Sequence, residues 1–206
     1  MSVLLTIAAA SIVATVFAIA VAGKARATGF AGFERAVGRL WFGPGVLTAR
    51  TRRLVAVVVL SAEGMAAAGL AGMVLVLLLG SPADSAWRAT GILARASFVV
   101  AAVMLGAFAV AQAVAVRRRL SAPCACFGRT AATTGPVGVV RSAVLFAVCV
   151  AGATIERPGP AGTVACLVAV LAGCVTAQLL VNLEDLVSLF RTSPTPIVAT
   201  RPDADR

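Results

Sequence analysis

Long apolar blocks alternate along the chain with short polar segments. The blocks cover residues 2–22, 54–80, 87–116, 137–155 and 161–183. Because an α-helix rises about 1.5 Å per residue, a helix over each block can cross the roughly 30 Å hydrocarbon layer of a bilayer. The blocks lack the single apolar stripe that is typical of helices on soluble proteins. The pattern therefore predicts an all-α fold, a polytopic membrane bundle of about five transmembrane helices.

The polar segments divide the chain into a membrane domain and a tail. We expect residues 1–185 to form one transmembrane domain, and residues 186–206 to form a polar, disordered tail. The first block has no Lys or Arg before it, and Lys24 and Arg26 follow it, which favours a retained helix over a signal peptide. Between the first two blocks, residues 30–40 predict a short amphipathic helix on the headgroups, with its arginines and Glu34 facing water.

The composition supports a lipid environment and excludes several soluble functions. Hydrophobic residues make up 60% and charged residues 13% of the chain, against about 45–50% and about 25% in ordinary soluble domains. The net charge is +10, but aromatic residues make up only 5% and Tyr is absent, so binding of nucleic acid is not expected. The absence of His excludes His-ligated haem, His-rich zinc sites and Ser-His-Asp chemistry.

The basic residues also predict the orientation in the membrane. Most of the 18 Lys and Arg residues lie in the loop after the first block, in segment 117–141 and in the tail. These segments lie on one side of a five-helix bundle, and the positive-inside rule makes that side cytoplasmic. We therefore expect a multi-pass protein of the cell membrane, with its N-terminus outside and its C-terminus in the cytoplasm.

Cys124-Ala125-Cys126 is the sharpest chemical motif in the chain. Two thiols separated by one residue can close a small, strained disulfide ring, and such a pair exchanges more readily than an unstrained disulfide. Nearby arginines would favour the thiolate form. The alternatives are an inert pair or half of a thiolate metal site. No metal is expected, because a zinc site needs four ligands and the other cysteines lie inside apolar blocks.

Three further cysteines, Cys149, Cys166 and Cys174, lie within the fourth and fifth blocks. Cysteine inside an apolar helix commonly acts as a small hydrophobic residue. The other interpretation is a ladder of thiols that passes electrons across the membrane. The spacing of these residues does not decide between the two.

Glu63 is an ionisable residue inside the second block. A charged side chain at that depth is costly unless it is paired or faces a wet interior. Arg141 lies at a comparable depth near the start of the fourth block, and Lys24 at the end of the first block could also reach inward. The two interpretations are a structural Glu63–Arg141 pair and a role in moving a proton or substrate.

These features occur in the order found in a known family. They are Gly23-Lys24, Phe33, Glu63, Cys124-Ala125-Cys126-Phe127-Gly128 and Arg141. In this order the chain resembles the methylamine utilisation protein MauE, within the wider group of DoxX-like small membrane proteins, over roughly residues 1 to 185. The C-x-C-F-G motif is the specific element of the resemblance. Two positions depart from the family pattern: Ala125 stands where Gly is more common, and Ser142 stands where Asn is expected.

The resemblance implies a membrane protein that assists maturation of a disulfide-rich partner, the small subunit of methylamine dehydrogenase in the namesake. It implies thiol–disulfide exchange at Cys124 and Cys126 with a thioredoxin-fold partner, supported by Glu63, Arg141 and Lys24. Phe127 and Gly128 complete the motif. Disulfide formation in exported proteins takes place outside the cytoplasm, whereas the charge pattern predicts a cytoplasmic motif.

Two rival functions compete with thiol–disulfide exchange. One is a non-catalytic membrane scaffold that binds a partner, in which the Cys pair is incidental. The other is a quinone-linked subunit, as DoxX-like relatives suggest, which would carry a lipophilic cofactor. Under the leading hypothesis no bound cofactor is expected. The client protein and the direction of electron flow are not indicated by the sequence.

Overall fold

The computed structural model describes residues 2–41, 48–79, 84–118, 136–154 and 162–190. These residues form helices only, with no strand among them. In chain order the helices are α1 (Ser2–Ala25), α2 (Ala27–Trp41), α3 (Ala49–Leu79), α4 (Asp84–Arg117), α5 (Pro136–Thr154), α6 (Thr163–Val181) and α7 (Leu183–Phe190).

Five of the described helices are long and apolar enough to cross a membrane: α1, α3, α4, α5 and α6. This confirms the all-α membrane bundle predicted from the apolar blocks. The helix ends differ from the predicted ends by a few residues. The largest difference is at α3, which begins at Ala49 because the exposed Arg50 and Arg53 extend the helix beyond its apolar part.

Two shorter amphipathic helices flank the bundle. The predicted helix over residues 30–40 is present as α2, but its apolar face packs against protein: Phe33 and Val37 are buried with Ala56 of α3 and Phe108 of α4. Helix α7 ends at Phe190, so helical structure extends into the segment that was predicted as a polar tail. Residues 191–206 lie outside the described part of the chain.

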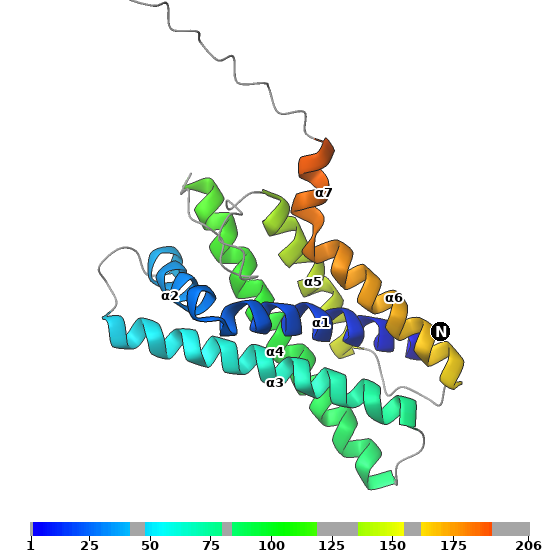
Figure 1. Cartoon of the computed structure of the whole chain (residues 1–206). Helices are drawn as coiled ribbons and strands as arrows, with labels where there is room; N and C mark the ends of the chain where they lie inside the picture. Colours follow the sequence, from blue (N-terminus) through cyan, green and yellow to red (C-terminus); the bar gives the residue numbers. More distant parts are fainter. Residues whose placement is uncertain (1, 42–47, 80–83, 119–135, 155–161, 191–206) are drawn as a thin grey trace, which may run out of the picture.

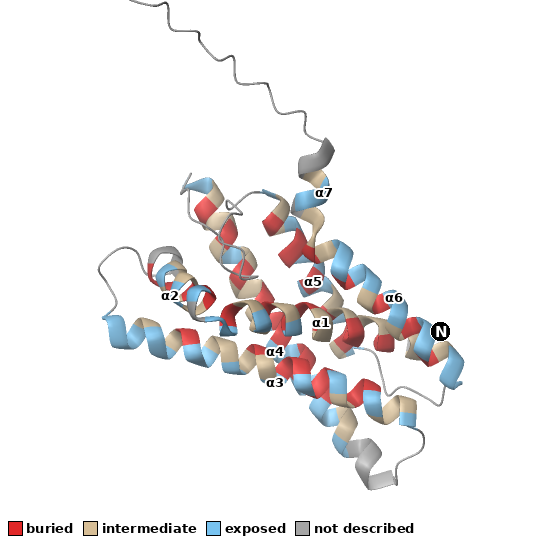
Figure 2. Cartoon of the chain, in the orientation of Figure 1, coloured by how far each residue is buried: buried red, intermediate tan, exposed pale blue. Residues whose placement is uncertain are grey.

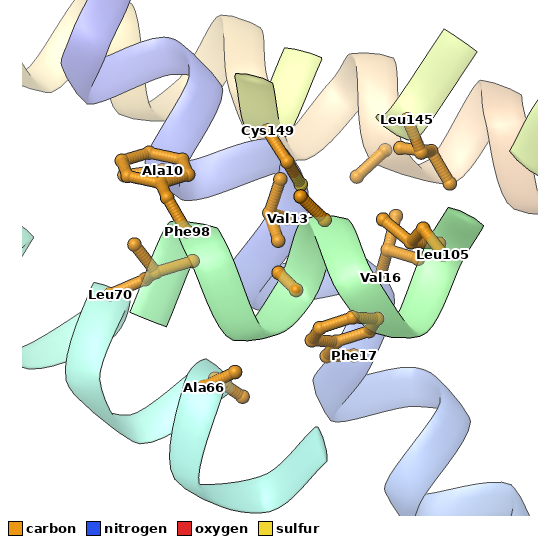
Figure 3. Packing of buried hydrophobic residues seen from close by; sticks show 14 of the residues in the cluster. Ala10, Val13, Val16, Phe17, Ala66, Leu70, Phe98, Leu105, Leu145 and Cys149 are labelled. Carbon is orange, nitrogen blue, oxygen red and sulfur yellow. The ribbon is translucent and has the colours of Figure 1, made fainter. Parts of the chain in front are cut away.

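Helix α1 lies centrally in the bundle (Figure 1). It packs against α3, which runs in the opposite direction, and against α6, while α4 pairs mainly with α5. Side chains from α1, α3, α4 and α5 meet in the core, including Val13, Leu70, Phe98 and Cys149 (Figure 3). Buried residues thus line the inner faces of these helices, and exposed residues lie mainly on the outer faces (Figure 2). Outward-facing apolar side chains such as Met65 suit contact with lipid.

Small residues let neighbouring helices approach closely. A Cβ atom added to Gly173 of α6 would lie 2.8 Å from the backbone oxygen of Ala8 in α1. At Gly69 of α3, an added Cβ would clash with the Ser97 hydroxyl of α4. By contrast, an added Cβ at Gly64 or Gly72 would meet no atom within 4 Å. Small residues therefore fix the α1–α6 and α3–α4 contacts, as expected for helix packing in membranes.

Candidate functional site

A buried ion pair between α1 and α3 is the main charged feature inside the described bundle. The Nζ atom of Lys24 donates to both carboxylate oxygens of Glu63, at 2.5 Å to Oε1 and 2.8 Å to Oε2. The side chains are 0% and 1% exposed, respectively. Charges buried so completely need a partner, because an unpaired charge away from water is very costly.

The directions of the two helices explain how these side chains meet. On an α-helix the side chains lean toward the N-terminus of the helix. Lys24 lies at the end of α1, so its chain leans back into the bundle and away from the nearer membrane surface. Glu63 lies within α3, which runs the opposite way, so its chain leans toward the end where Lys24 lies. Two antiparallel helices therefore bring a terminal lysine to an internal glutamate.

Two aromatic rings from other helices complete the surroundings of the lysine. Lys24 Nζ lies 4.5 Å from the ring centroid of Phe33 in α2 and 5.3 Å from that of Phe108 in α4. A lysine ammonium has three N–H donors, and Glu63 accepts two hydrogen bonds from it. The negative faces of the rings stabilise the rest of the charge by cation–π attraction. The pair and its rings thereby connect α1, α2, α3 and α4.

A second buried polar group lies further along α4. The Ser142 hydroxyl of α5 donates to Oε1 of Gln112 at 3.4 Å, and both residues are buried. Gln112 follows Phe108 by one helical turn, so both lie on the same face of α4. The neighbouring Arg141 is also buried, and its Nη1 donates to the backbone oxygen of Val181 in α6 at 3.5 Å. Polar contacts thus link α4, α5 and α6.

The predicted pair between Glu63 and Arg141 is wrong, because Lys24 is the partner of Glu63. Glu63 and Arg141 lie at comparable depths in their apolar blocks, but depth does not determine which helices are neighbours. Helix α5 packs mainly on α4 and makes few contacts with α3, so Arg141 is held near α6 and not at Glu63. The expectation that Lys24 reaches inward is confirmed.

Two of the three cysteines within the helices, Cys149 and Cys166, are buried among apolar residues. Cys149 lies in the main core, and Cys166 lies beside Ile7 of α1. The thiol of Cys174 is 3.5 Å from the hydroxyl of Thr15. Cys124, Cys126, Phe127 and Gly128 lie outside the described residues, in the segment that leaves α4 after Arg118 and enters α5 at Pro136.

The sequence did not predict the contact of Phe108 with Lys24 or that of Ser142 with Gln112. Phe108 lies in an apolar block, where an aromatic ring is indistinguishable from any other core side chain. The sequence signal for its role is its position four residues before Gln112, because residues four apart share a helix face and Phe108 therefore lies on the face that carries a polar residue. In the sequence Ser142 stands out only as a departure from the family pattern, and its hydroxyl makes the contact with Gln112.

Replacing Phe33 with leucine is a mild test of the aromatic contact. Leucine keeps an apolar side chain at the position but removes the ring face from Lys24. We expect the free energy of unfolding to fall by about 0.5–2 kcal/mol, the usual range for a cation–π contact. The measurement is unfolding in mixed micelles of a mild detergent and dodecyl sulfate. In a Lys24→Met background the same substitution should cost less, and an equal cost would show that the ring stabilises only by packing.

Comparison with known proteins identifies a family. A family model described as Methylamine utilisation protein MauE matches residues 1–155 of the chain. No curated protein and no solved structure matches. The matched region contains both residues of the ion pair, the aromatic rings and the Cys124-Ala125-Cys126 motif.

Proposed function

The chain belongs to the MauE family, and from this membership we propose that it carries out thiol–disulfide exchange in the membrane and assists the maturation of a disulfide-containing client. Cys124 and Cys126 form the exchanging pair, and a thioredoxin-fold protein is the redox partner. The protein is multi-pass, with five described helices that can cross a membrane. The small subunit of methylamine dehydrogenase is the client that the family resemblance implies, and a different client would leave the chemistry unchanged.

The Cys124-Ala125-Cys126 motif is the observation that carries this proposal. The two thiols stand in the connection between α4 and α5, within the region that the family model matches. Arg117 and Arg118 at the end of α4 are exposed and precede the motif closely in the chain. Positive charge near a thiol favours the thiolate, which is the reactive form in disulfide exchange.

Thiol–disulfide exchange needs no oxidant other than the disulfide of the thioredoxin-fold partner. A thiolate of the Cys pair attacks the disulfide of the thioredoxin-fold partner, so the S–S bond of the partner breaks and a mixed disulfide forms. The second cysteine then attacks the mixed disulfide, and the partner leaves as a dithiol. Cys124 and Cys126 lose two electrons as they form a disulfide, and their two protons pass to the thiols of the partner. The same steps in reverse reduce the pair.

The described helices support this proposal by holding both ends of the motif segment. Phe108 contacts Lys24, and Gln112 contacts Ser142, so α4 is attached to α1 and to α5 through buried groups. Arg141 attaches the beginning of α5 to α6. Rigid helix ends would limit the range of positions open to the two thiols.

Single serine variants test the proposed exchange. One of Cys124→Ser and Cys126→Ser should accumulate a mixed disulfide with a partner, visible on non-reducing gels, because the resolving thiol is missing. The double variant should form none and should fail to support client disulfides. Cys174→Ser is the matched control and should behave as the wild type, because its thiol contacts Thr15 inside the bundle.

Thiol labelling reports the side of the membrane on which Cys124 and Cys126 lie and the redox state of the pair. A membrane-impermeant reagent is applied to intact cells and to inverted vesicles, and labelling of Cys124 and Cys126 is compared. The proposal requires the labelling to change with the redox conditions of growth. Constant labelling, absence of any mixed disulfide and normal client disulfides in the double variant would favour the scaffold function instead.

A further inference from the structure

Exposed arginines gather at one end of the bundle. They lie at the junction of α1 and α2, on α2, in the first turns of α3 and at the end of α4. We call this the arginine surface, and its residues are Arg26, Arg35, Arg50, Arg53, Arg117 and Arg118. Helix α1 ends beside α3 in the half of the bundle where α3 begins, although the first turns of α3 extend beyond it, and α2 packs on α3 and α4 in the same half (Figure 1).

These guanidinium groups lack carboxylate partners within the described part of the chain. The ion pair found there joins Lys24 to Glu63, so the Glu63 carboxylate is already bound. Arg35 donates from Nε to the backbone oxygen of Ala31 in its own helix, which leaves its positive charge without a counter-charge. The arginine surface therefore presents several uncompensated charges to its surroundings.

The lengths of the helices place the arginine surface at headgroup depth. Helix α3 has 31 residues and is about 45 Å long at 1.5 Å per residue, which exceeds the roughly 30 Å hydrocarbon layer. Its apolar part ends at Leu79, so the excess length lies at the other end, where Arg50 and Arg53 are exposed. Helix α4 likewise ends in the exposed Arg117.

The docking of α2 adds a fixed part to this surface. Its apolar residues Phe33 and Val37 are buried against α3 and α4. At Gly38, an added Cβ would lie 2.6 Å from Cδ of Arg52, so the stem of Arg52 lies close across α2. Helix α2 is therefore attached to the bundle through its apolar face, and Arg35 on its other side faces outward.

We propose that the arginine surface binds the headgroups of anionic phospholipids. Guanidinium groups suit phosphates because they can donate two parallel hydrogen bonds to one phosphate. Anionic lipids attract basic residues at the membrane surface by about a fivefold gain in affinity per residue. Lipid binding at this surface does not require thiol–disulfide exchange, and the variants that test it, at Arg50 and Arg53, leave unchanged the Arg117 and Arg118 that precede the Cys pair.

The test uses the full chain in nanodiscs of phosphatidylcholine, with or without phosphatidylglycerol. After gentle detergent release, native mass spectrometry counts the lipids of each type that stay bound. The wild type should retain phosphatidylglycerol preferentially, and Arg50→Gln/Arg53→Gln should lower that preference by about fivefold or more. Arg95→Gln, which removes an exposed arginine from the other half of α4, is the control and should leave the preference unchanged.

Three results would overturn the proposal. They are equal retention of both lipids by the wild type, an unchanged preference in the double variant, and an equal fall in the Arg95→Gln control. Inorganic phosphate added to the nanodiscs that contain phosphatidylglycerol separates a lipid site from a phosphate site, because free phosphate should not displace bound phosphatidylglycerol from a lipid site. If the double Gln variant is not monodisperse, Arg26→Gln/Arg35→Gln is measured instead. It removes two exposed charges from the same surface, so it should lower the preference, and an unchanged preference would contradict the proposal.

Discussion

Replacing Lys24 with methionine is expected to destabilise the folded protein by about 3–5 kcal/mol. Methionine fills much of the space of the lysine chain but leaves the Glu63 carboxylate, which is 1% exposed, without its cationic partner. Breaking a buried ion pair on one side costs this much because an uncompensated charge stays buried. The measurement is the free energy of unfolding in mixed micelles, together with the yield of monodisperse protein after extraction in a mild detergent.

The double variant Lys24→Met/Glu63→Leu separates the pair from its packing. With both charges removed, no buried charge lacks a partner, and most of the stability lost in Lys24→Met should return. Apolar replacements of whole buried ion pairs are often neutral or stabilising. Arg95→Gln serves as the control for loss of a charge from an exposed position. If the double variant is as unstable as Lys24→Met, the charges contribute through contacts other than the pair.

The double variant also tests why a charged pair stays in an apolar bundle. Ionisable residues inside membranes are costly and tend to be kept for function. The pair contacts Phe108 of α4, the helix that leads into the segment carrying Cys124 and Cys126. A double variant that folds normally but exchanges thiols more slowly would indicate that the pair positions α4 for exchange. A double variant with normal exchange would limit the pair to a structural role.

The transmembrane helices could be predicted from the sequence because each is an apolar block of sufficient length. The existence of α2 followed in the same way from its amphipathic pattern. What the apolar face of α2 packs against could not be predicted, since such a face can contact either lipid or other helices. Phe33 and Val37 contact Ala56 and Phe108, and only the folded bundle determines that choice.

The partner of Glu63 is the clearest limit of prediction from the sequence. Hydropathy gives the depth of a residue in the membrane, and both Lys24 and Arg141 were within reach by depth. Which helix lies beside α3 depends on packing, and the close approach of α1 decides it in favour of Lys24. For Cys124 and Cys126 the prediction of an exchanging pair rests on their spacing in the sequence, and the two residues lie outside the described part of the chain.

The packing that places α1 can be tested at Gly173 of α6. An added Cβ there would lie 2.8 Å from the backbone oxygen of Ala8 and 2.8 Å from Cβ of Ser11, both in α1. Neither atom belongs to the end of a flexible side chain, and the Ser11 hydroxyl is bonded to the backbone oxygen of Ile7. Gly173→Ala should therefore force α1 and α6 apart and lower the free energy of unfolding by about 1–3 kcal/mol.

Gly72→Ala in α3 is the matched control, because an added Cβ at this position would meet no atom within 4 Å. Alanine favours the helical conformation over glycine by up to about 1 kcal/mol, so this variant should be neutral or slightly more stable. Both variants are compared by unfolding in the same mixed micelles. Equal effects at Gly173 and Gly72 would contradict a close contact between α1 and α6. A loss of stability confined to Gly173→Ala would show that α1 and α6 are in close contact because position 173 has no Cβ atom. This contact is part of the packing that holds α1, and with it Lys24, in place.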